Sequence, residues 1–332
     1  MRPNRYSLIV AAVVALFGSN LAAQGDVPIP SAPECCAPIL LPIGARTVAL
    51  GQALTAGAGA EAMFFNPGGL VDVTEDQFLV HRPALARAEV NTFSLLISSR
   101  LAGVFALTYR LIDFGDAEAT QDGSGVPTGV LTTLDQVLIA SYARRLAFGL
   151  SAGFSYKLYD FRNICSGVCG DGATFSGTTH LFDVGMQYQP SQWPHVLIGA
   201  SLMHMGLDFW SAAEDGAADP TPARFRVGAA YEFGHHFEQQ PATSIWLYTD
   251  LVQRVRDAGP PALNVGMEMI LEDAVRFRLG RASTADDVGS GGLALGVGLK
   301  YQRFNISVGR AFSATPLDPE GKSVHITFAI QF

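Results

Sequence analysis

Four cysteines are the residues of this chain with the clearest capacity for chemistry, and they form two close pairs. Three residues separate Cys165 from Cys169, so in an oxidising compartment they can close a small disulfide loop. A metal site would need more ligands nearby, and the next Cys or His along the chain is His180. We therefore predict a Cys165–Cys169 disulfide and no metal. The pairing of the adjacent residues Cys35 and Cys36 stays open.

Catalytic motifs are absent from the sequence. There is no H-E-x-x-H and no G-x-S-x-G. The segment 321–323 (Gly-Lys-Ser) resembles the end of a phosphate-binding loop, but the first glycine of that motif would fall on Pro316. The pair His235–His236 ends a strand-like segment, where we favour a solvated turn over a metal site. We predict no catalytic residues, no enzymatic activity and no cofactor.

The charge balance excludes nucleic acid as a partner. The chain has 22 Lys and Arg against 30 Asp and Glu, a net charge of -8, and its basic residues do not cluster. Binding to phosphate backbones requires a basic face. Hydrophobic residues make up 48% of the chain and charged residues only 16%, which is too apolar for a disordered protein.

The pattern of the first residues indicates an export signal. Arg2 and Arg5 precede an apolar run over 8–17, and small residues follow up to Ala23. This order is typical of a secretory signal peptide, and the run is too short to span a bilayer as a helix. We predict a signal peptide over 1–23, with Gly25 as the alternative cleavage site.

From residue 77 onward, apolar residues alternate with small or polar ones, as in half-buried strands. The last segment is the clearest, because Val324, Ile326, Phe328, Ile330 and Phe332 alternate with polar or small residues. We predict about fourteen strands, near 77–82, 90–98, 101–112, 133–143, 146–160, 174–189, 195–206, 223–234, 243–253, 262–271, 275–281, 292–301, 303–311 and 322–332.

The connections between these segments tend to alternate between short and long. Links such as 99–100 and 144–145 are brief, whereas 113–130 and 211–222 are long and rich in turn residues. Outer-membrane barrels alternate in this way, with an even number of strands. A soluble β-sandwich or propeller would not be expected to show it. The fold class is therefore all-β, a closed antiparallel transmembrane β-barrel formed by 77–332, with a small plug or hatch over 24–76.

Charged residues also occupy the parity that faces away from lipid. In a barrel lumen we favour pairing among themselves over a role in holding the plug or lining a path. Aromatic residues near strand ends, among them Phe209 and Trp246, fit interfacial girdles. The lumen-lining candidates are Arg224, Arg226, Glu232, Glu268, Arg276 and Arg278.

The segment before the first strand carries two short motifs. The first is G-A-R-x-x-A-L-G-x-A from Gly44, and the second is the turn F-x-N-P-G-G-L, in which the glycines tolerate positive φ. With the strands that follow, this order resembles the FadL-like superfamily of outer-membrane barrels, and more closely its PorV/PorQ branch. The matching hatch residues are Gly44, Arg46, Gly51, Asn66, Pro67 and Gly69, with Gly68 where the family commonly has alanine.

The resemblance implies two functions. FadL-type members pass hydrophobic compounds such as fatty acids to a lateral opening at a kink in the third strand, for which Gly103 is the candidate by position. PorV-type members act with a protein secretion system and escort cargo at the cell surface. We favour passive transport of hydrophobic compounds, with the secretion role as the alternative. An apolar pocket between plug and barrel would favour transport, and a polar, tightly plugged lumen would favour partner binding.

The resemblance also implies the location and partners of the chain. We expect it in the bacterial outer membrane, in contact with lipid, and with a hydrophobic small molecule or a secreted protein as cargo. The terminal residues Phe328, Ile330 and Phe332 resemble the signal that such barrels present to the barrel assembly machinery.

Overall fold

The computed structural model describes residues 34–120, 126–170, 173–210, 218–233, 243–256, 258–283, 292–313, 317, 321 and 323–332. The predicted signal peptide (1–23), the histidine pair 235–236 and Pro316 lie outside these residues. The described part of the chain belongs to one compact unit, 32–332.

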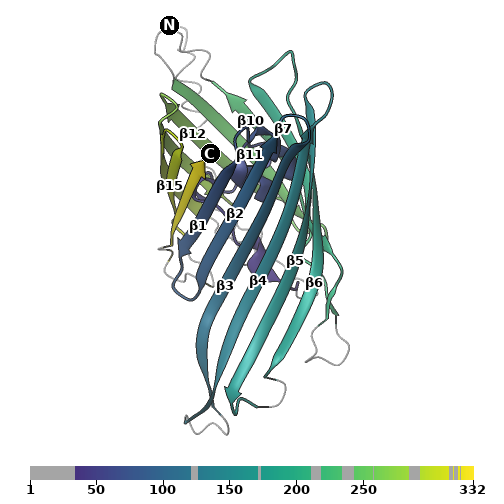
Figure 1. The fold of residues 1–332 in the computed structure, drawn as a ribbon, viewed down its shortest axis with the longest axis vertical. Coiled ribbons are helices and arrows are strands. Elements are labelled where there is room, and N and C mark those ends of the chain that lie inside the picture. Colours follow the sequence, from purple (N-terminus) through teal and green to yellow (C-terminus); the bar gives the residue numbers. More distant parts are fainter. Residues whose placement is uncertain are drawn as a thin grey trace. The chain divides into compact units, whose positions relative to one another are not determined.

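Fourteen of the described strands form a closed antiparallel barrel, and each pairs with its neighbours along the chain (Figure 1). The first strand pairs with the last, from Gln77 with Gln331 to Ala84 with Val324, and this closes the ring. A two-residue hairpin, β8 (Phe209–Trp210) with β9 (Ala218–Asp219), lies in the connection between β7 and β10. The barrel strands are β1 (Gln77–Ala84), β2 (Glu89–Ser99), β3 (Gly103–Thr120), β4 (Pro127–Arg145), β5 (Leu150–Gly167), β6 (Phe175–Tyr188), β7 (Val196–Gly206), β10 (Arg224–Glu232), β11 (Thr243–Arg254), β12 (Ala262–Leu271), β13 (Val275–Ala282), β14 (Gly292–Tyr301), β15 (Phe304–Ala311) and β16 (Val324–Gln331).

The predicted fold class is confirmed, with two local corrections. Residues 146–149 alternate like a strand but form the turn before β5, where Phe148 and Gly149 both have positive φ. The expected long loop over 113–130 is largely strand, because β3 runs on to Thr120 and β4 starts at Pro127. Figure 1 shows β3 to β6 reaching past the other strands at one end of the barrel. We call this the loop end, and the opposite end, where Gln77 and Phe332 lie, the turn end.

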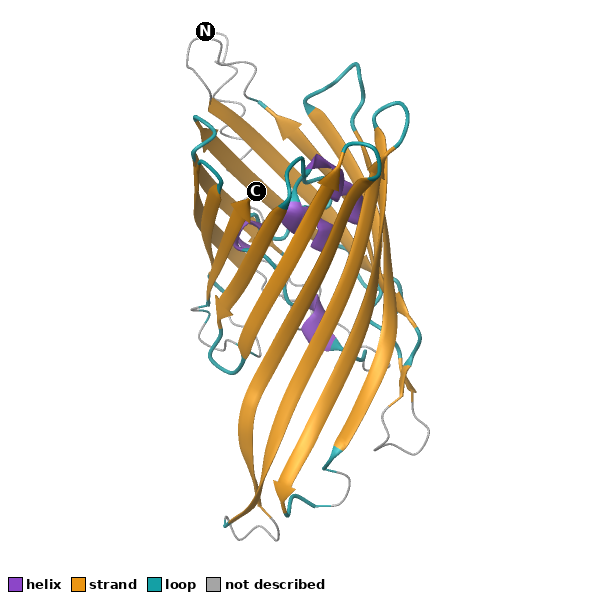
Figure 2. Cartoon of the chain, in the orientation of Figure 1, coloured by secondary structure: helices purple, strands orange, loops and turns teal. Residues whose placement is uncertain are grey.

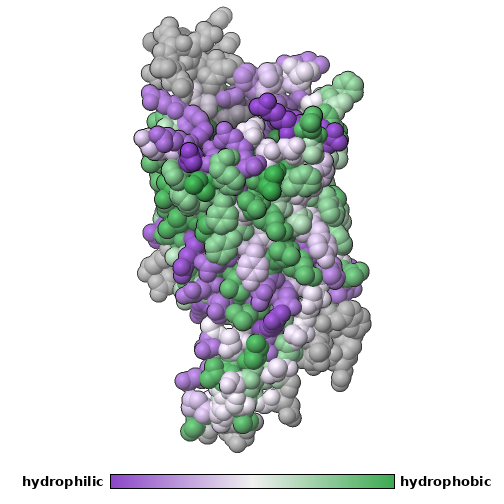
Figure 3. Space-filling view, viewed as in Figure 1, coloured by the Kyte–Doolittle hydropathy of each residue, from purple (hydrophilic) through white to green (hydrophobic). Residues whose placement is uncertain are grey.

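The outer wall carries a hydrophobic band. In β14 the outward residues Leu293, Leu295, Val297 and Leu299 are 42 to 50% exposed, while Gly296 and its inward neighbours face the lumen. Figure 3 shows hydrophobic residues crossing the visible strands as a band, with hydrophilic residues gathered above it. A closed barrel with such a band satisfies every strand hydrogen bond inside hydrocarbon. Among the described helices, none is long and apolar enough to cross a membrane.

The segment before β1 lies inside the ring of strands (Figure 2). It contains four short helices, η1 (Ala37–Leu40), α2 (Ala45–Ala49), η2 (Ala60–Phe64) and η3 (Pro67–Asp72). Its apolar side chains form the core of the molecule together with the inner wall, since Leu50, Leu54 and Phe65 cluster with Leu197 and Tyr248. We call residues 34–76 the plug, because they fill the lumen rather than line it.

Inward-facing glycines let the wall touch the backbone of the plug. A Cβ atom on Gly280 or Gly309 would collide with backbone atoms of the plug residues Gly51 or Ala45. On the other side of the lumen, Gly153 meets the backbone of Pro67, and Gly185 meets the side chains of Asn66 and Pro67. Strand glycines commonly mark such close approaches. The wall and the plug are therefore fitted to each other along two lines of contact.

Candidate functional site

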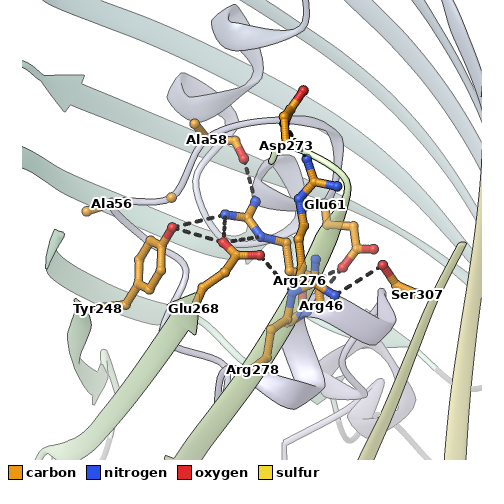
Figure 4. A network of polar contacts seen from close by, with 12 residues as sticks. Arg46, Ala56, Ala58, Glu61, Tyr248, Glu268, Asp273, Arg276, Arg278 and Ser307 are labelled. Atoms are coloured by element: carbon orange, nitrogen blue, oxygen red, sulfur yellow. Dashed lines mark hydrogen bonds and ion pairs between the residues drawn. The ribbon is translucent and has the colours of Figure 1, made fainter. Parts of the chain in front are cut away.

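The main anchor of the plug is an ion-pair network around Arg46 (Figure 4). The Arg46 guanidinium donates to Glu268 Oε2 (2.9 Å), to the Ala58 carbonyl (2.7 Å) and to Tyr248 Oη (3.1 Å). Glu268 Oε1 accepts from Arg278 Nε at 2.7 Å. Burial alone would lower the pKa of Arg46, but the Glu268 carboxylate beside it raises that pKa above its ordinary value. Arg46 thus remains charged, and it ties the plug to β11 and β12.

Two glycines of the predicted hatch motif shape this anchor. Gly44 precedes α2 with φ of 108°, and a side chain there would collide with Glu61. The Glu61 carboxylate accepts from the Thr47 amide at 3.1 Å, and burial raises the pKa of Glu61. Gly51 follows the helix with φ of 61° and lies against the backbone of β13. At both positions the left-handed conformation favours glycine.

A second anchor joins the plug to β10 and β11. Arg226 donates to Asp250 Oδ2 (2.9 Å), and that oxygen also accepts from the Thr55 amide (3.0 Å) and hydroxyl (2.6 Å). Arg224 forms a bidentate pair with Glu34 at 2.9 and 2.8 Å. Sequence alone favoured pairing among the lumen charges, and Glu268 with Arg278 is such a pair. In the structure, several of these charged side chains contact plug residues instead.

The Asn-Pro turn is the third anchor. Asn66 is fully buried and starts η3, where its side chain accepts from the Gly68 amide at 2.9 Å. Its Nδ2 donates to the carbonyls of Thr55 (2.7 Å) and Met186 (2.8 Å). From the sequence, the glycines after Pro67 were expected to tolerate a positive φ. In the structure neither has one, and Gly68 and Gly69 are small because backbone packs against them.

Between the plug and the loop half of the barrel lies a cavity of about 50 Å³. One side is apolar, formed by plug residues 39–43, Phe64 and Phe65 with Val137, Ile139 and Met203. The other side is basic. Its lining contains four cationic side chains and no carboxylate: Arg110, Lys157, Arg224 and Arg226. We call this space the plug cavity.

Three of the four cations have carboxylate partners behind the lining. Lys157 pairs with Asp183 at 2.6 Å, and Arg224 and Arg226 pair with Glu34 and Asp250. Arg110 does not pair with any described carboxylate, although it is only 2% exposed. Its Nη1 donates to the Leu41 carbonyl at 3.1 Å, its Nε has no hydrogen-bond partner, and Asp135 acts on it electrostatically without direct contact.

A β-bulge lies at the same depth of the wall. The β6–β7 register shifts between Phe182 and Val184, and His204 on β7 has φ of 57°. Asp183 accepts from the His204 amide at 2.8 Å, and Lys157 Nζ lies 3.0 Å from His204 Nδ1. Bulges often re-aim side chains next to functional sites. Sequence reasoning missed Arg110, Lys157 and His204, for which inward parity in a strand was the available signal.

The remaining predicted residues lie away from this cavity. Glu232 contacts His195 at 3.2 Å near the turn end, and Arg276 contacts Asp273 at 2.9 Å. Gly103 is the first residue of β3 and pairs regularly with Ser99 at the turn end. The register shift of β3 against β4 lies farther along, between Asp113 and Asp116, around Gly115.

The cysteines and the aromatic residues can also be compared with the predictions from the sequence. The structure joins Cys165 to Cys169 near the loop end and Cys35 to Cys36 in the plug. Trp246 and Phe209 do not fit a lipid-facing girdle. Trp246 packs with the buried core and Phe209 is buried. Within the described ranges, no three metal-ligating side chains converge.

The C-terminal strand supports a test of assembly. Phe328 points outward and Ile330 shares its parity, while Phe332 is 66% exposed and contributes one backbone bond, from its amide to the Asp76 carbonyl (2.9 Å). One such bond is worth about 0.5–1.5 kcal/mol, too little to decide closure of the barrel. We expect Phe332→Ala, which keeps that bond, to reduce the membrane-inserted, heat-modifiable form several-fold in cells. Normal insertion of this variant would contradict a recognition role of the terminal ring.

Comparison with known proteins places the fold. No family model and no curated protein matches the chain. Among solved structures, it is similar to the Ralstonia pickettii toluene transporter TbuX (14% identity, 87% of this chain and 98% of that chain, TM-score 0.53). It is also similar to the CymD monoaromatic hydrocarbon channel (13%, 87% and 97%, 0.57) and to the Pseudomonas putida toluene transporter TodX (13%, 86% and 96%, 0.51). At these identities the likeness is one of fold.

Proposed function

We propose that this chain is a FadL-like outer-membrane channel for passive uptake of hydrophobic compounds, and that its ligands carry a carboxylate on an apolar chain. It acts without enzymatic chemistry, in the bacterial outer membrane, with its turn end facing the periplasm. The short turns of such barrels lie on that side.

One observation carries the proposal: Arg110 is a buried cation without a direct carboxylate partner, and it lines a cavity whose opposite side is apolar. Among the described carboxylates Asp135 acts on Arg110 without touching it, and a buried charge with so indirect a partner is costly. A bound anion in direct contact with Arg110 would offset that cost. An apolar chain would contact Ile39, Leu41 and Ile139, and its carboxylate would accept hydrogen bonds from Arg110. Arginine suits this role because its planar fork matches a carboxylate.

The comparisons support the general class. TbuX, CymD and TodX are named as transporters or channels of toluene and monoaromatic hydrocarbons. Their ligands are hydrophobic and uncharged, so the carboxylate is a proposal drawn from the side chains of this chain alone.

The plug cavity is too small for such a ligand in the closed state, since its 50 Å³ holds only a few water molecules at about 10–15 Å³ each. Plug residues 39–43 form much of the lining and contribute no ion pair in the described structure. We infer that this segment moves to admit ligand while the Arg46 and Arg226 anchors hold. The tightly plugged lumen alone would favour partner binding, whereas the apolar side of the plug cavity favours transport. The PorV/PorQ branch and the secretion role remain predictions of the sequence, because no specific contact favours them.

Uptake by whole cells tests the proposal. The chain would be produced in bacteria that lack their own outer-membrane fatty-acid channel, and entry of labelled dodecanoate and labelled toluene would be measured. We expect dodecanoate entry to rise well above that of cells with an empty vector. Entry of toluene alone would overturn the carboxylate class. Entry of neither compound, with the barrel correctly inserted, would overturn the channel itself.

A further inference from the structure

A groove of about 560 Å³ lies on the outer wall over β11 to β16. Its lining side chains are almost all apolar and have outward parity, among them Met267, Phe277, Leu295 and Val297. This volume is in the range of about 300–1,000 Å³ found for small-molecule sites. The wall of a barrel is ordinarily convex, so a concavity of this size needs a cause.

The plug provides that cause. Gly280, Gly296 and Gly309 face inward in these strands, directly against plug residues 45–51. Each lies next to an outward residue of the groove, namely Leu279, Leu295 with Val297, and Val308 with Arg310. Because these glycines have no side chains, the strands lie in direct contact with the plug. The outer face of the wall is concave over the same residues.

One end of the groove is basic. Arg310 shares the outward parity of Ile306 and Val308, near the loop end of β15. Its Cζ lies 5.0 Å from the centroid of the Phe312 ring, and its buried Nε has no hydrogen-bond partner. No ion pair of Arg310 with any described residue is found. An arginine on the lipid face is costly unless it meets water or an anionic group.

We propose that this groove binds one acyl chain of an anionic, phosphate-bearing lipid of the outward-facing leaflet, whose phosphate pairs with Arg310. An apolar hollow that ends at a guanidinium without an ion pair to any described residue is complementary to an amphiphile with a negative headgroup. The loop end of the barrel is the side on which Arg310 meets the headgroup layer. This site is on the outside of the wall, so it is independent of the plug cavity and of the proposed transport.

Native mass spectrometry of the detergent-purified full chain tests the site. The probes are palmitoyl-oleoyl phosphatidylglycerol and phosphatidylcholine with the same chains. One basic residue near an anionic headgroup contributes about 1 kcal/mol, which is about fivefold in affinity. We expect one phosphatidylglycerol per barrel, bound about fivefold more tightly than phosphatidylcholine, and loss of this preference in Arg310→Gln.

Matched variants separate headgroup and chain. Arg303→Gln changes an exposed arginine at the turn end of β15 and should keep the preference. Val297→Trp fills the groove and should weaken both lipids, whereas Leu299→Trp, on the same strand but outside the groove, should weaken neither. Equal binding of the two lipids by the unmodified chain, an unchanged preference in Arg310→Gln, or full binding by Val297→Trp would each overturn the proposal.

Discussion

Planar bilayers that contain the Arg46→Met variant are expected to show frequent ionic conductance, whereas the unmodified barrel stays closed. Arg46 is the plug residue in the network around Glu268. Without Arg46, the buried Glu268 carboxylate keeps Arg278 and Tyr248 as partners. Removal of one partner from a buried ion pair costs about 3–5 kcal/mol. The equilibrium between seated and released plug should therefore shift by roughly 100- to 4,000-fold.

A surface variant provides the control for this result. Arg82 pairs with Glu89 at 3.4 Å, and both side chains are more than 60% exposed. Such a pair contributes about 0–1 kcal/mol, so Arg82→Met should stay closed. Glu268→Gln combined with Arg46→Met also takes the carboxylate away from the buried Arg278, so this double variant should not recover the closed state. Closed behaviour of correctly inserted Arg46→Met would show that the other two anchors suffice.

The barrel was predictable because lipid imposes a strict pattern on its strands. Every strand inside the hydrophobic band alternates, and all fourteen predicted segments correspond to strands of the barrel. The pattern fails where lipid is absent. The ends of β3 and β4 beyond Asp113 are largely exposed, so the sequence there shows turn residues and little alternation. Residues 146–149 form a turn in which large apolar and small residues happen to alternate. Only the positive φ values distinguish this turn from a strand.

The site was predictable only in part. The hatch motif marked Arg46, Gly51 and Asn66, all of which contact barrel strands in the structure. Their partners could not be deduced, since Arg46 meets Glu268 across 222 residues of chain. The alternation along the strands predicted that many polar residues face the lumen. It did not predict which of them lacks an ion-pair partner. Arg226 contacts the Asp250 carboxylate directly, whereas Arg110 contacts no described carboxylate, and this difference depends on how the closed barrel brings the strands together.

Replacing Arg110 with methionine should lower the affinity for dodecanoate by about tenfold to a hundredfold, because a hydrogen bond to a charged group contributes about 1.5–3 kcal/mol. Methionine keeps the apolar stem of the side chain, so dodecanol should bind as before. The Asp135 carboxylate acts electrostatically on Arg110, and the double variant with Asp135→Asn keeps the local charge balanced. Titration calorimetry of the purified barrel with both ligands is the measurement.

The comparison of the two ligands decides what Arg110 does. A selective loss of the carboxylate means that the guanidinium binds the headgroup, and Arg110→Lys should retain part of the affinity since it keeps the charge without the fork. Arg276→Met is the matched control, because Arg276 is a lumen arginine that does not line the plug cavity and should leave both ligands unaffected. An equal loss for dodecanoate and dodecanol would reduce Arg110 to a packing residue. The cation would then stabilise the plug through the Leu41 carbonyl, and the carboxylate of the ligand would have to be recognised elsewhere.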